Sequence, residues 1–394
     1  MFVQSSTGNA CPTWTAISLF EPGRYSMTTG CFADLPDPFG DHADGQVGRF
    51  PGATPTNGLN CAMRHHAKRQ TADHKPSLAR REATRHIARQ PMTAGGFVIS
   101  HDKRDARLSA IVADDAAGER LATGFMFTEG PLWNPQGRFL LFSDMPGDHL
   151  RKWSAADGIT TFRKPCHKSN GLAYDHQGRL LVCEHASSRV TRTEADGSST
   201  VLASHWRDQE LNSPNDIVVH SDGSIYFTDP TYGRMDGFGL KRDTELAFRG
   251  AYRIGTDGTL ALLADDFDQP NGLCFSLDER RLFINDTSRG HIRVFDVHPD
   301  GTLAGGAIWA ETKGPGNGAP DGMKIDTAGN LYCCGPNGPH GGIHVFAPDA
   351  TCLGVIGLPE GVANFCWGDD DLQSLYVTAT TSLYRIRMRQ PGRL

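Results

Sequence analysis

The stretch Asn215-Asp-Ile-Val-Val, with a turn at Gly223 and the segment Ser224-Ile-Tyr-Phe-Thr-Asp behind it, carries the pattern that decides the fold. An oxygen-bearing residue opens a short apolar run, a turn lies eight positions later, and a β-prone segment follows. The pattern occurs six times, opening at Glu129, Asn170, Asn215, Asn271, Asp321 and Asn364. Self-similar units of about 40 to 50 residues built from strands and turns are typical of β-propeller blades.

Each repeat supplies further strands. Apolar second segments begin at Arg138, Arg179, Ser224, Arg281, Asn330 and Ser374, and a third segment follows in every repeat. Asp-Gly pairs at 157, 196, 257 and 300 predict tight turns into a fourth strand, and Asp349-Ala350 takes that place in the fifth repeat. The last repeat reaches Leu394 without a fourth strand, so we expect residues 107–123 to supply it and close the ring. The sequence therefore predicts an all-β fold, a six-bladed propeller over 107–394.

The first strand of each propeller blade lines the central channel, so the six opening residues are predicted to form a ring at one end of it. The ring would contain two carboxylates, Glu129 and Asp321, and four Asn side chains. Converging carboxylate and amide oxygens suit Ca²⁺, and suit Mg²⁺ or Mn²⁺ less well. Because Asn and Asp also cap turns, a purely structural role is the alternative at any single position.

Four of these segments resemble successive motifs of the SMP-30/gluconolactonase family, also called the regucalcin-like family. They are Thr128-Glu-Gly-Pro-Leu-Trp, Ser213-Pro-Asn-Asp-Ile, Pro270-Asn-Gly-Leu and Ala319-Pro-Asp-Gly-Met, and the resemblance spans about 125–385. It is nearest to the bacterial gluconolactonase branch. Animal members carry an Arg where this chain has Ser213, so their mode of sugar recognition is not expected here.

The resemblance implies a six-bladed propeller with a catalytic divalent metal in the channel, most often Ca²⁺, with Mg²⁺, Mn²⁺ or Zn²⁺ as alternatives. Its implied ligands are Glu129, Asn215, Asn271 and Asp321, and Asp321 is the implied general base or nucleophile. The implied reaction is hydrolysis of a sugar lactone of the gluconolactone type to the aldonic acid. A metal-polarised carbonyl attacked with the help of a carboxylate is sound chemistry for that reaction.

Further residues are candidates for binding the sugar hydroxyls. They are Asn170, His185 and Asn215, and for His185 a packing role is the alternative. Asn364 is expected to be structural because its repeat lacks the regular glycine turn. The insertion between Asp229 and Gly250 is too long for a hairpin and is expected to form a rim or lid over the channel.

Residues 1–100 differ in composition from the rest of the chain. They contain ten Lys and Arg against seven Asp and Glu, a charge of +3 within a chain of net charge −6, and little periodicity. We interpret them as an extension that is disordered, or as residues included because the start of the protein is misassigned. Met92 is a plausible true start. The small charge excess and the lack of interleaved aromatic residues argue against a nucleic-acid partner.

Composition gives weaker indications about partners and compartment. No run of eighteen apolar residues predicts a membrane span, and no secretory signal is visible, so we expect a cytoplasmic protein that is a monomer or homodimer. The spacing of the ten cysteines fits neither zinc pairs nor a disulfide framework, and buried free thiols are expected.

Two other functions stay open on the sequence alone. One is a different lactonase or a phosphotriesterase-like esterase on the same site, because one fold hosts several chemistries. The other is a non-catalytic calcium-binding propeller. The two carboxylates of the predicted ring argue against the second, since an interaction platform has no need of them at the channel mouth.

Overall fold

The structure is a computed structural model that describes residues 2–4, 13–20, 24–31, 95–312, 319–335 and 342–393. The chain divides into two units, Met1–Ala83 and Thr84–Leu394. In the first unit the backbone forms one antiparallel sheet of β1 (Phe2–Gln4), β2 (Thr13–Phe20) and β3 (Arg24–Cys31). Most of the predicted extension, including Met92, lies outside the described residues, so its disorder stays a prediction.

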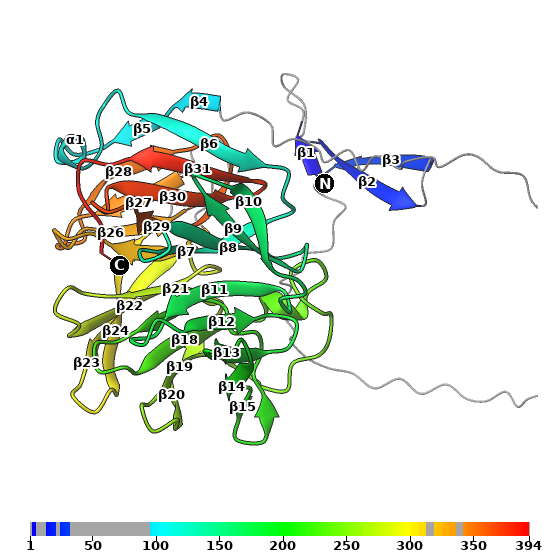
Figure 1. Ribbon diagram of the computed structural model, residues 1–394, viewed down its shortest axis with the longest axis vertical. Coiled ribbons are helices and arrows are strands. Elements are labelled where there is room, and N and C mark those ends of the chain that lie inside the picture. Colours follow the sequence, from blue (N-terminus) through cyan, green and yellow to red (C-terminus); the bar gives the residue numbers. More distant parts are fainter. Residues whose placement is uncertain are drawn as a thin grey trace, which may run out of the picture. The chain divides into compact units, whose positions relative to one another are not determined.

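The second unit is a propeller of six antiparallel sheets, numbered here as blades in chain order (Figure 1). Blade 1 contains β7 (Thr128–Asn134), β8 (Phe139–Asp144), β9 (His149–Ser154) and β10 (Gly158–Arg163). Blade 2 contains β11 (Ser169–Tyr174), β12 (Leu180–Glu184), β13 (Arg189–Thr193) and β14 (Ser199–Ala203), followed by a small hairpin of β15 (His205–Trp206) and β16 (Gln209–Glu210). Blade 3 contains β17 (Ile217–Val219), β18 (Ile225–Asp229), β19 (Arg249–Ile254) and β20 (Leu260–Phe267).

The remaining blades follow the same order. Blade 4 contains β21 (Pro270–Phe275), β22 (Arg281–Asp286), β23 (His291–Val297) and β24 (Leu303–Glu311). Blade 5 contains β25 (Met323–Ile325), β26 (Leu331–Cys334), β27 (Gly342–Phe346) and β28 (Cys352–Gly357). Blade 6 contains β29 (Val362–Gly368), β30 (Ser374–Ala379) and β31 (Ser382–Arg387).

The ring of blades closes as the sequence predicts. Strand β6 (Ala117–Thr123) pairs antiparallel with β31 and becomes the fourth strand of blade 6. The pairing extends further toward the N-terminus than residue 107, because β5 (Ser100–Lys103) adds to β28 and β4 (Gly95–Val98) adds to β6. Helix α1 (Leu108–Ile111) lies between these strands in the sequence and buries Leu108 and Ile111. Two blades therefore have five strands, and the sheets begin at Gly95.

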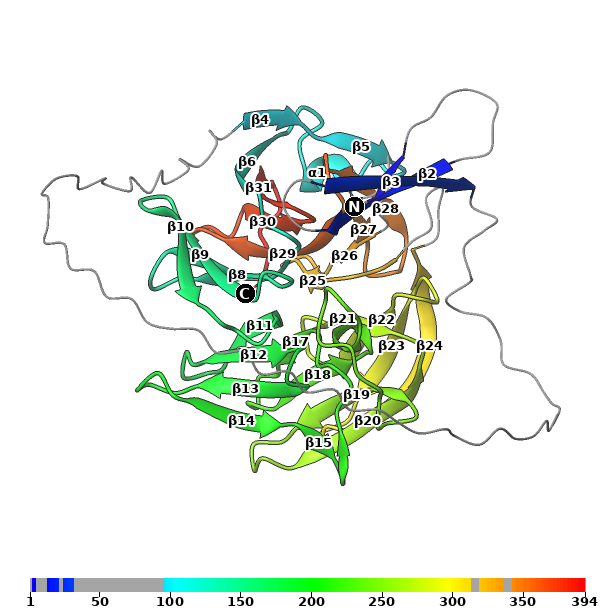
Figure 2. The ribbon, with the colours of Figure 1, turned by 90° about the vertical axis from the view of Figure 1, so that its right-hand side faces the viewer.

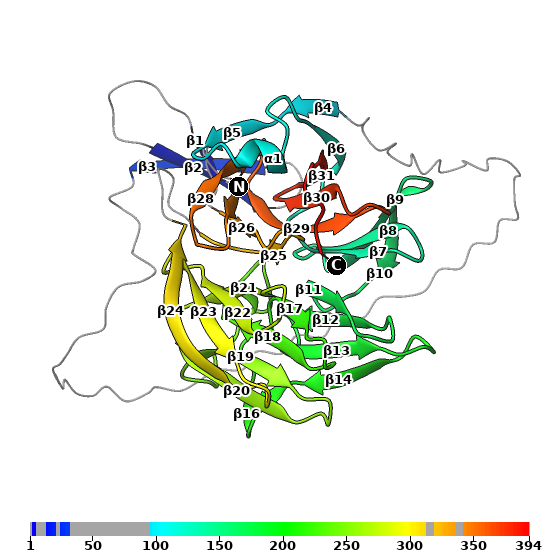
Figure 3. The ribbon, with the colours of Figure 1, turned by 90° about the vertical axis from the view of Figure 1, so that its left-hand side faces the viewer.

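Innermost strands β7, β11, β17, β21, β25 and β29 contact one another in that cyclic order around the channel. Figures 2 and 3 show them near the centre, with β10, β14, β20 and β24 toward the periphery. Among the described residues, buried apolar side chains form six clusters, and each cluster joins two neighbouring blades. The core therefore lies between the sheets, and burial of this apolar surface holds the blades in register.

The turns predicted eight residues after each ring position are present. Gly178, Gly223 and Gly329 have positive φ there, and so do Glu279 and Leu372, which carry side chains. In blade 1 the positive φ falls at Arg138, one residue after the predicted turn. The seven cysteines with described side chains are free thiols, and all but Cys352 are buried, as expected.

Candidate active site

The six residues that open the repeats lie at one end of the innermost strands. Five of them are buried, and Asp321 is half-buried. Four lie within the first residues of their strands, and the other two come shortly before β17 and β25. The set comprises Glu129, Asn170, Asn215, Asn271, Asp321 and Asn364. The ring predicted from the repeat is therefore present at one mouth of the channel.

Glycines beside the ring allow the blades to approach closely. A Cβ atom on Gly130 would lie 2.0 Å from the carbonyl oxygen of Asn170 in the next blade. A Cβ atom on Gly272 would lie 2.2 Å from the carbonyl oxygen of Asp321, and Gly171 is similarly crowded. No side chain fits at these distances, so Glu-Gly and Asn-Gly at the strand starts bring successive ring residues together.

Glu129 and Asp321 form a pair of carboxyl groups at the ring. They lie near enough for the charge of Glu129 to act on the Asp321 carboxyl. Removal from water is the largest cause that raises the pKa of each carboxyl, and repulsion from neighbouring carboxylates raises the pKa of both further. Glu129 Oε2 also accepts hydrogen bonds from the Gly130 backbone N–H at 2.8 Å and from Asn364 Nδ2 at 3.3 Å. Two such groups need a shared proton or a cation to lie together.

The donor set fits a hard divalent cation. Asn271 Nδ2 donates to Thr287 Oγ1 at 3.1 Å, which leaves the Asn271 Oδ1 atom available as a ligand. Asn364 Oδ1 instead accepts from the Phe365 backbone N–H at 2.9 Å, so this side chain is engaged on both sides. The described residues contain no cluster of three or more His, Cys, Asp and Glu side chains suited to a metal. Amide oxygens and water would therefore have to complete a shell around the two carboxylates.

His185 connects two of the predicted substrate-binding residues. His185 directly follows β12 and is fully buried. Burial lowers its pKa to about 4, so its imidazole is neutral at physiological pH. Nδ1 lies 3.2 Å from the Phe238 carbonyl oxygen, to which it donates in the tautomer assigned from its neighbours. Nε2 then accepts from Asn170 Nδ2 at 3.2 Å and from Asn215 Nδ2 at 3.5 Å. Both amides are thereby oriented with their nitrogens toward His185.

The insertion between Asp229 and Gly250 packs beside this histidine, as expected for a rim. It contains the short 3₁₀ helix η2 (Tyr232–Arg234), and the Phe238 ring lies edge-on to Phe127 at 5.4 Å. Ser213 holds the first residues of the insertion in place. Its hydroxyl donates to the Pro230 carbonyl oxygen at 2.6 Å and accepts from the Gly233 N–H at 2.9 Å. The residue at the position of the animal-type Arg is therefore a buried structural serine.

Sequence reasoning missed a charged pair deeper in the channel. Lys324 Nζ lies 3.8 Å from Asp216 Oδ2, and that oxygen accepts no hydrogen bond from a described residue. A signal for both was available in the repeat. Asp216 directly follows a ring residue where four other repeats have Gly, and Lys324 occupies a position that is apolar in the other repeats.

Comparison with known proteins places the chain in a family. The model of the SMP-30/gluconolactonase/LRE-like region matches residues 127–381. The chain belongs to this family. Family membership agrees with the resemblance carried by the four sequence motifs.

Individual relatives agree with that assignment. The gluconolactonase of Zymomonas mobilis is 31% identical over 323 residues, which cover 76% of this chain and 88% of the relative. A pentonolactonase of Haloferax volcanii is 26% identical over an alignment that covers 64% of this chain and 80% of the relative. The solved structure of a gluconolactonase from Xanthomonas campestris superposes with a TM-score of 0.68 at 33% identity, over 76% of this chain and 99% of that one.

Proposed function

We propose that the protein hydrolyses a sugar lactone of the gluconolactone type to the aldonic acid, at the ring mouth of the channel. The observation that carries this proposal is the pair of carboxyl groups, Glu129 and Asp321, which lie near each other and are both withdrawn from water. Such a pair is costly without a compensating charge. The gluconolactonase relatives described above support the choice of substrate class.

A divalent cation, Ca²⁺ in our proposal, is the compensating charge. Glu129 and Asp321 would hold it through carboxylate oxygens, and Asn215 and Asn271 through amide oxygens. When bound, it would polarise the lactone carbonyl and stabilise the negative charge that develops on its oxygen. Asn364 would fix the Glu129 carboxylate by the hydrogen bond to Oε2.

Asp321 is the proposed base or nucleophile. As a whole residue it is half-buried, whereas Glu129 is buried. As a base, Asp321 takes a proton from the attacking water while the water oxygen bonds to the carbonyl carbon, and it gives that proton to the leaving oxygen as the lactone C–O bond breaks. As a nucleophile, its carboxylate bonds to the carbonyl carbon while the lactone C–O bond breaks, and water then hydrolyses the mixed anhydride that results. Single turnover in ¹⁸O-labelled water followed by mass spectrometry tests the second route, because label enters Asp321 only when water attacks the Asp321 carbonyl of the anhydride.

Asn170, Asn215 and His185 are proposed to bind the sugar hydroxyls. The contacts suggest a division of labour, in which the neutral His185 orients the amides of Asn170 and Asn215. Their Oδ1 atoms are then free to accept hydrogen bonds from hydroxyl groups or to contact the cation. The rim formed by the 229–250 insertion would limit the size of the sugar.

The test is a hydrolysis panel followed by a pH indicator. It compares glucono-, galactono- and xylonolactones with homoserine lactones and paraoxon-like esters, each with and without added Ca²⁺, Mg²⁺, Mn²⁺ or Zn²⁺. The proposal expects sugar lactones to be turned over fastest and chelation to abolish the turnover. Faster hydrolysis of a homoserine lactone or a phosphotriester would contradict the proposed substrate class, and full activity in chelator would contradict the metal.

A further inference from the structure

A cavity opens at the end of the innermost strands away from the ring residues. Its volume is about 540 Å³, within the range of small-molecule sites. The innermost strands begin at the ring residues and end at this cavity. Gly178, Ser221 and Glu279, which lie in the turns after these strands, are among its lining residues. At about 3.3 Å per residue, four residues of strand separate its walls from the ring. We call it the turn-side cavity.

Large apolar side chains form the wall of the turn-side cavity. Five of them stand four residues after a ring position, and Trp367 stands three residues after Asn364. The set is Trp133, Tyr174, Val219, Phe275, Ile325 and Trp367. The aromatic rings are held in place from behind, since Trp133 stacks on Tyr376 at 5.3 Å and Phe275 lies edge-on to Tyr226 at 5.0 Å. Such a preformed wall favours a flat apolar ligand.

Lys324 is the charged exception in this wall. The equivalent positions of blades 1 to 4 hold Leu132, Ala173, Val218 and Cys274, all of them apolar. The Lys324 side chain is 25% exposed, and its only ion-pair partner among the described residues is Asp216 Oδ2 at 3.8 Å. That distance is too long for a hydrogen bond, so the ammonium keeps donors free for an acceptor in the cavity.

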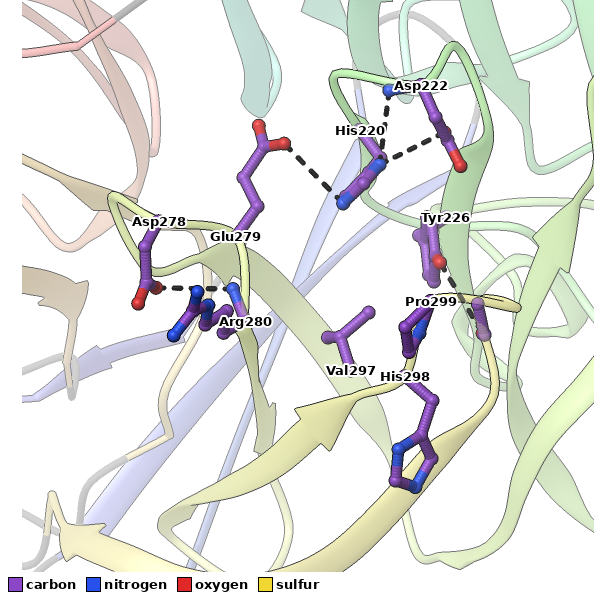
Figure 4. A pocket seen from close by; sticks show the side chains of 10 residues that line it. His220, Asp222, Tyr226, Asp278, Glu279, Arg280, Val297, His298 and Pro299 are labelled. Carbon is purple, nitrogen blue, oxygen red and sulfur yellow. Dashed lines mark hydrogen bonds and ion pairs between the residues drawn. The ribbon is translucent and has the colours of Figure 1, made fainter.

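The two acidic residues that line the turn-side cavity, Glu279 and Asp175, each pair with an arginine. Glu279 Oε1 pairs with Arg393 Nη2 at 3.0 Å, and Asp175 Oδ2 pairs with Arg179 Nε at 2.7 Å. Figure 4 shows Glu279 from the side of a neighbouring pocket, where its Oε2 lies 3.5 Å from His220 Nε2. Arg393 itself lines the cavity. A ligand therefore meets positive charge from Lys324 and Arg393 without an uncompensated carboxylate at the mouth.

We infer that the turn-side cavity binds a small aromatic carboxylate. Its carboxylate accepts a hydrogen bond from Lys324, and its flat body packs between the aromatic side chains of the wall. This site is separate from the ring and does not depend on the function proposed there. A charge-assisted hydrogen bond in a partly dry cavity is strong enough to distinguish an acid from its amide.

The test uses 2-naphthoate as the probe, the uncharged 2-naphthamide as its matched analogue, and gluconate as a polar anion. Calorimetry on the full chain is expected to give saturable binding of 2-naphthoate, about tenfold tighter than 2-naphthamide. Gluconate is expected not to bind there. No saturable binding of 2-naphthoate at millimolar concentration, or tighter binding of gluconate, would overturn the inference.

Variants locate the probe. Lys324→Met is expected to remove the preference for the acid over the amide, and Lys103→Met, which neutralises an exposed lysine elsewhere, to keep it. Val219→Trp fills the cavity and is expected to abolish binding of both aromatic probes. Ser221→Trp at the exposed mouth serves the same purpose if Val219→Trp fails to fold. Unchanged binding in the filled variants would overturn the assignment.

A metal control separates this site from the ring. The affinity for 2-naphthoate is expected to be equal with Ca²⁺ and with chelator, and gluconolactone is expected not to displace the probe. Binding that requires Ca²⁺ or is displaced by gluconolactone would place the probe at the ring and contradict the inference. Either result leaves the lactonase proposal to its own test.

Discussion

The side-chain amide of Asn364 donates a hydrogen bond to Glu129 Oε2 over 3.3 Å, although 235 residues separate the two in the chain. The contact joins blade 6 to blade 1, the point at which the ring of blades closes. Asn364 Oδ1 is held in turn by the Phe365 backbone N–H. Closure of the propeller therefore also orients one of the two carboxylates of the candidate site.

Replacing this amide should weaken metal binding more than folding. Asn364→Leu keeps the approximate volume and removes the donor, so Glu129 loses a partner that fixes its carboxylate. Outer partners of metal ligands contribute about tenfold or more to affinity, and we expect a loss of that order for Ca²⁺. Calorimetric titration measures it, and an unchanged affinity in a folded variant would show that Asn364 has no part in the site.

The carboxylate and amide ligands proposed for the cation should differ in how much they contribute to Ca²⁺ affinity. Glu129→Gln removes a negative charge from the shell of the cation, whereas water can replace the amide lost in Asn271→Ser. We therefore expect Glu129→Gln to lower Ca²⁺ affinity more than Asn271→Ser does. Titration of both variants side by side decides this, and equal losses would sink the proposed division of roles.

The carboxyl pair should make the stability of the metal-free protein depend on pH. Burial raises the pKa of Glu129 to about 7, and it also raises that of Asp321. Because the folded state binds these protons more tightly than the unfolded state, their contribution is present at pH values below the ordinary carboxyl pKa and is lost as pH rises through the raised one. The Tm in chelator should therefore fall between about pH 5 and 8.

Saturating Ca²⁺ should remove much of that fall, because a bound cation favours the ionised pair. Asp229, whose pKa burial also raises to about 7, lies outside the ring and keeps its contribution in both conditions. The informative quantity is thus the difference between the two Tm curves, which should widen with pH. Parallel curves would contradict a metal bound at these carboxylates.

One turn offers a stabilising substitution. The tight turns after the third strands place Gly158, Gly197, Gly258 and Gly301 at positive φ, and the fifth blade has Ala350 there with φ 67°. A left-handed conformation costs a residue with a Cβ about 1 kcal/mol. Ala350→Gly should therefore raise the free energy of unfolding by roughly 0.5–1 kcal/mol, measured by denaturant titration. A destabilised variant would mean that the lost methyl contact outweighs the relief of strain.

The repeat explains why so much of the fold could be predicted from sequence. Each apolar run and each Asp-Gly turn is a local signal that recurs in register, so the blades, the closing strand at 117–123 and the ring followed from one pattern. Strands β4 and β5 gave no such signal, because their pairing with blades 5 and 6 depends on partners more than 250 residues away or on the closing strand. The role of Asn364 was likewise hidden, since its turn at Leu372 lacks a glycine while its side chain contacts the first blade.

The candidate site was predictable in its residue types and only partly in its contacts. Glu129 and Asp321 stand out as the two acids among the six ring residues. The link from Asn170 through His185 to Asn215 depends on the side-chain directions of two blades, which sequence spacing does not determine. Asp216 and Lys324 lie one and three residues after ring positions. The repeat predicts glycine or apolar packing residues there, so the pattern gives no indication that these two form an ion pair.

The most direct test of the proposed mechanism is Asp321→Asn. Asparagine keeps an oxygen for the cation but accepts a proton poorly and attacks poorly, so kcat for gluconolactone should fall by roughly two to four decades, the range for a lost general base. The measurement is kcat at saturating metal, corrected for spontaneous ring opening, beside a bound-metal assay on the same sample. The proposed mechanism predicts that large fall with metal still bound. A kcat within a few-fold of the parent with metal present would contradict it and make Asp321 a ligand alone.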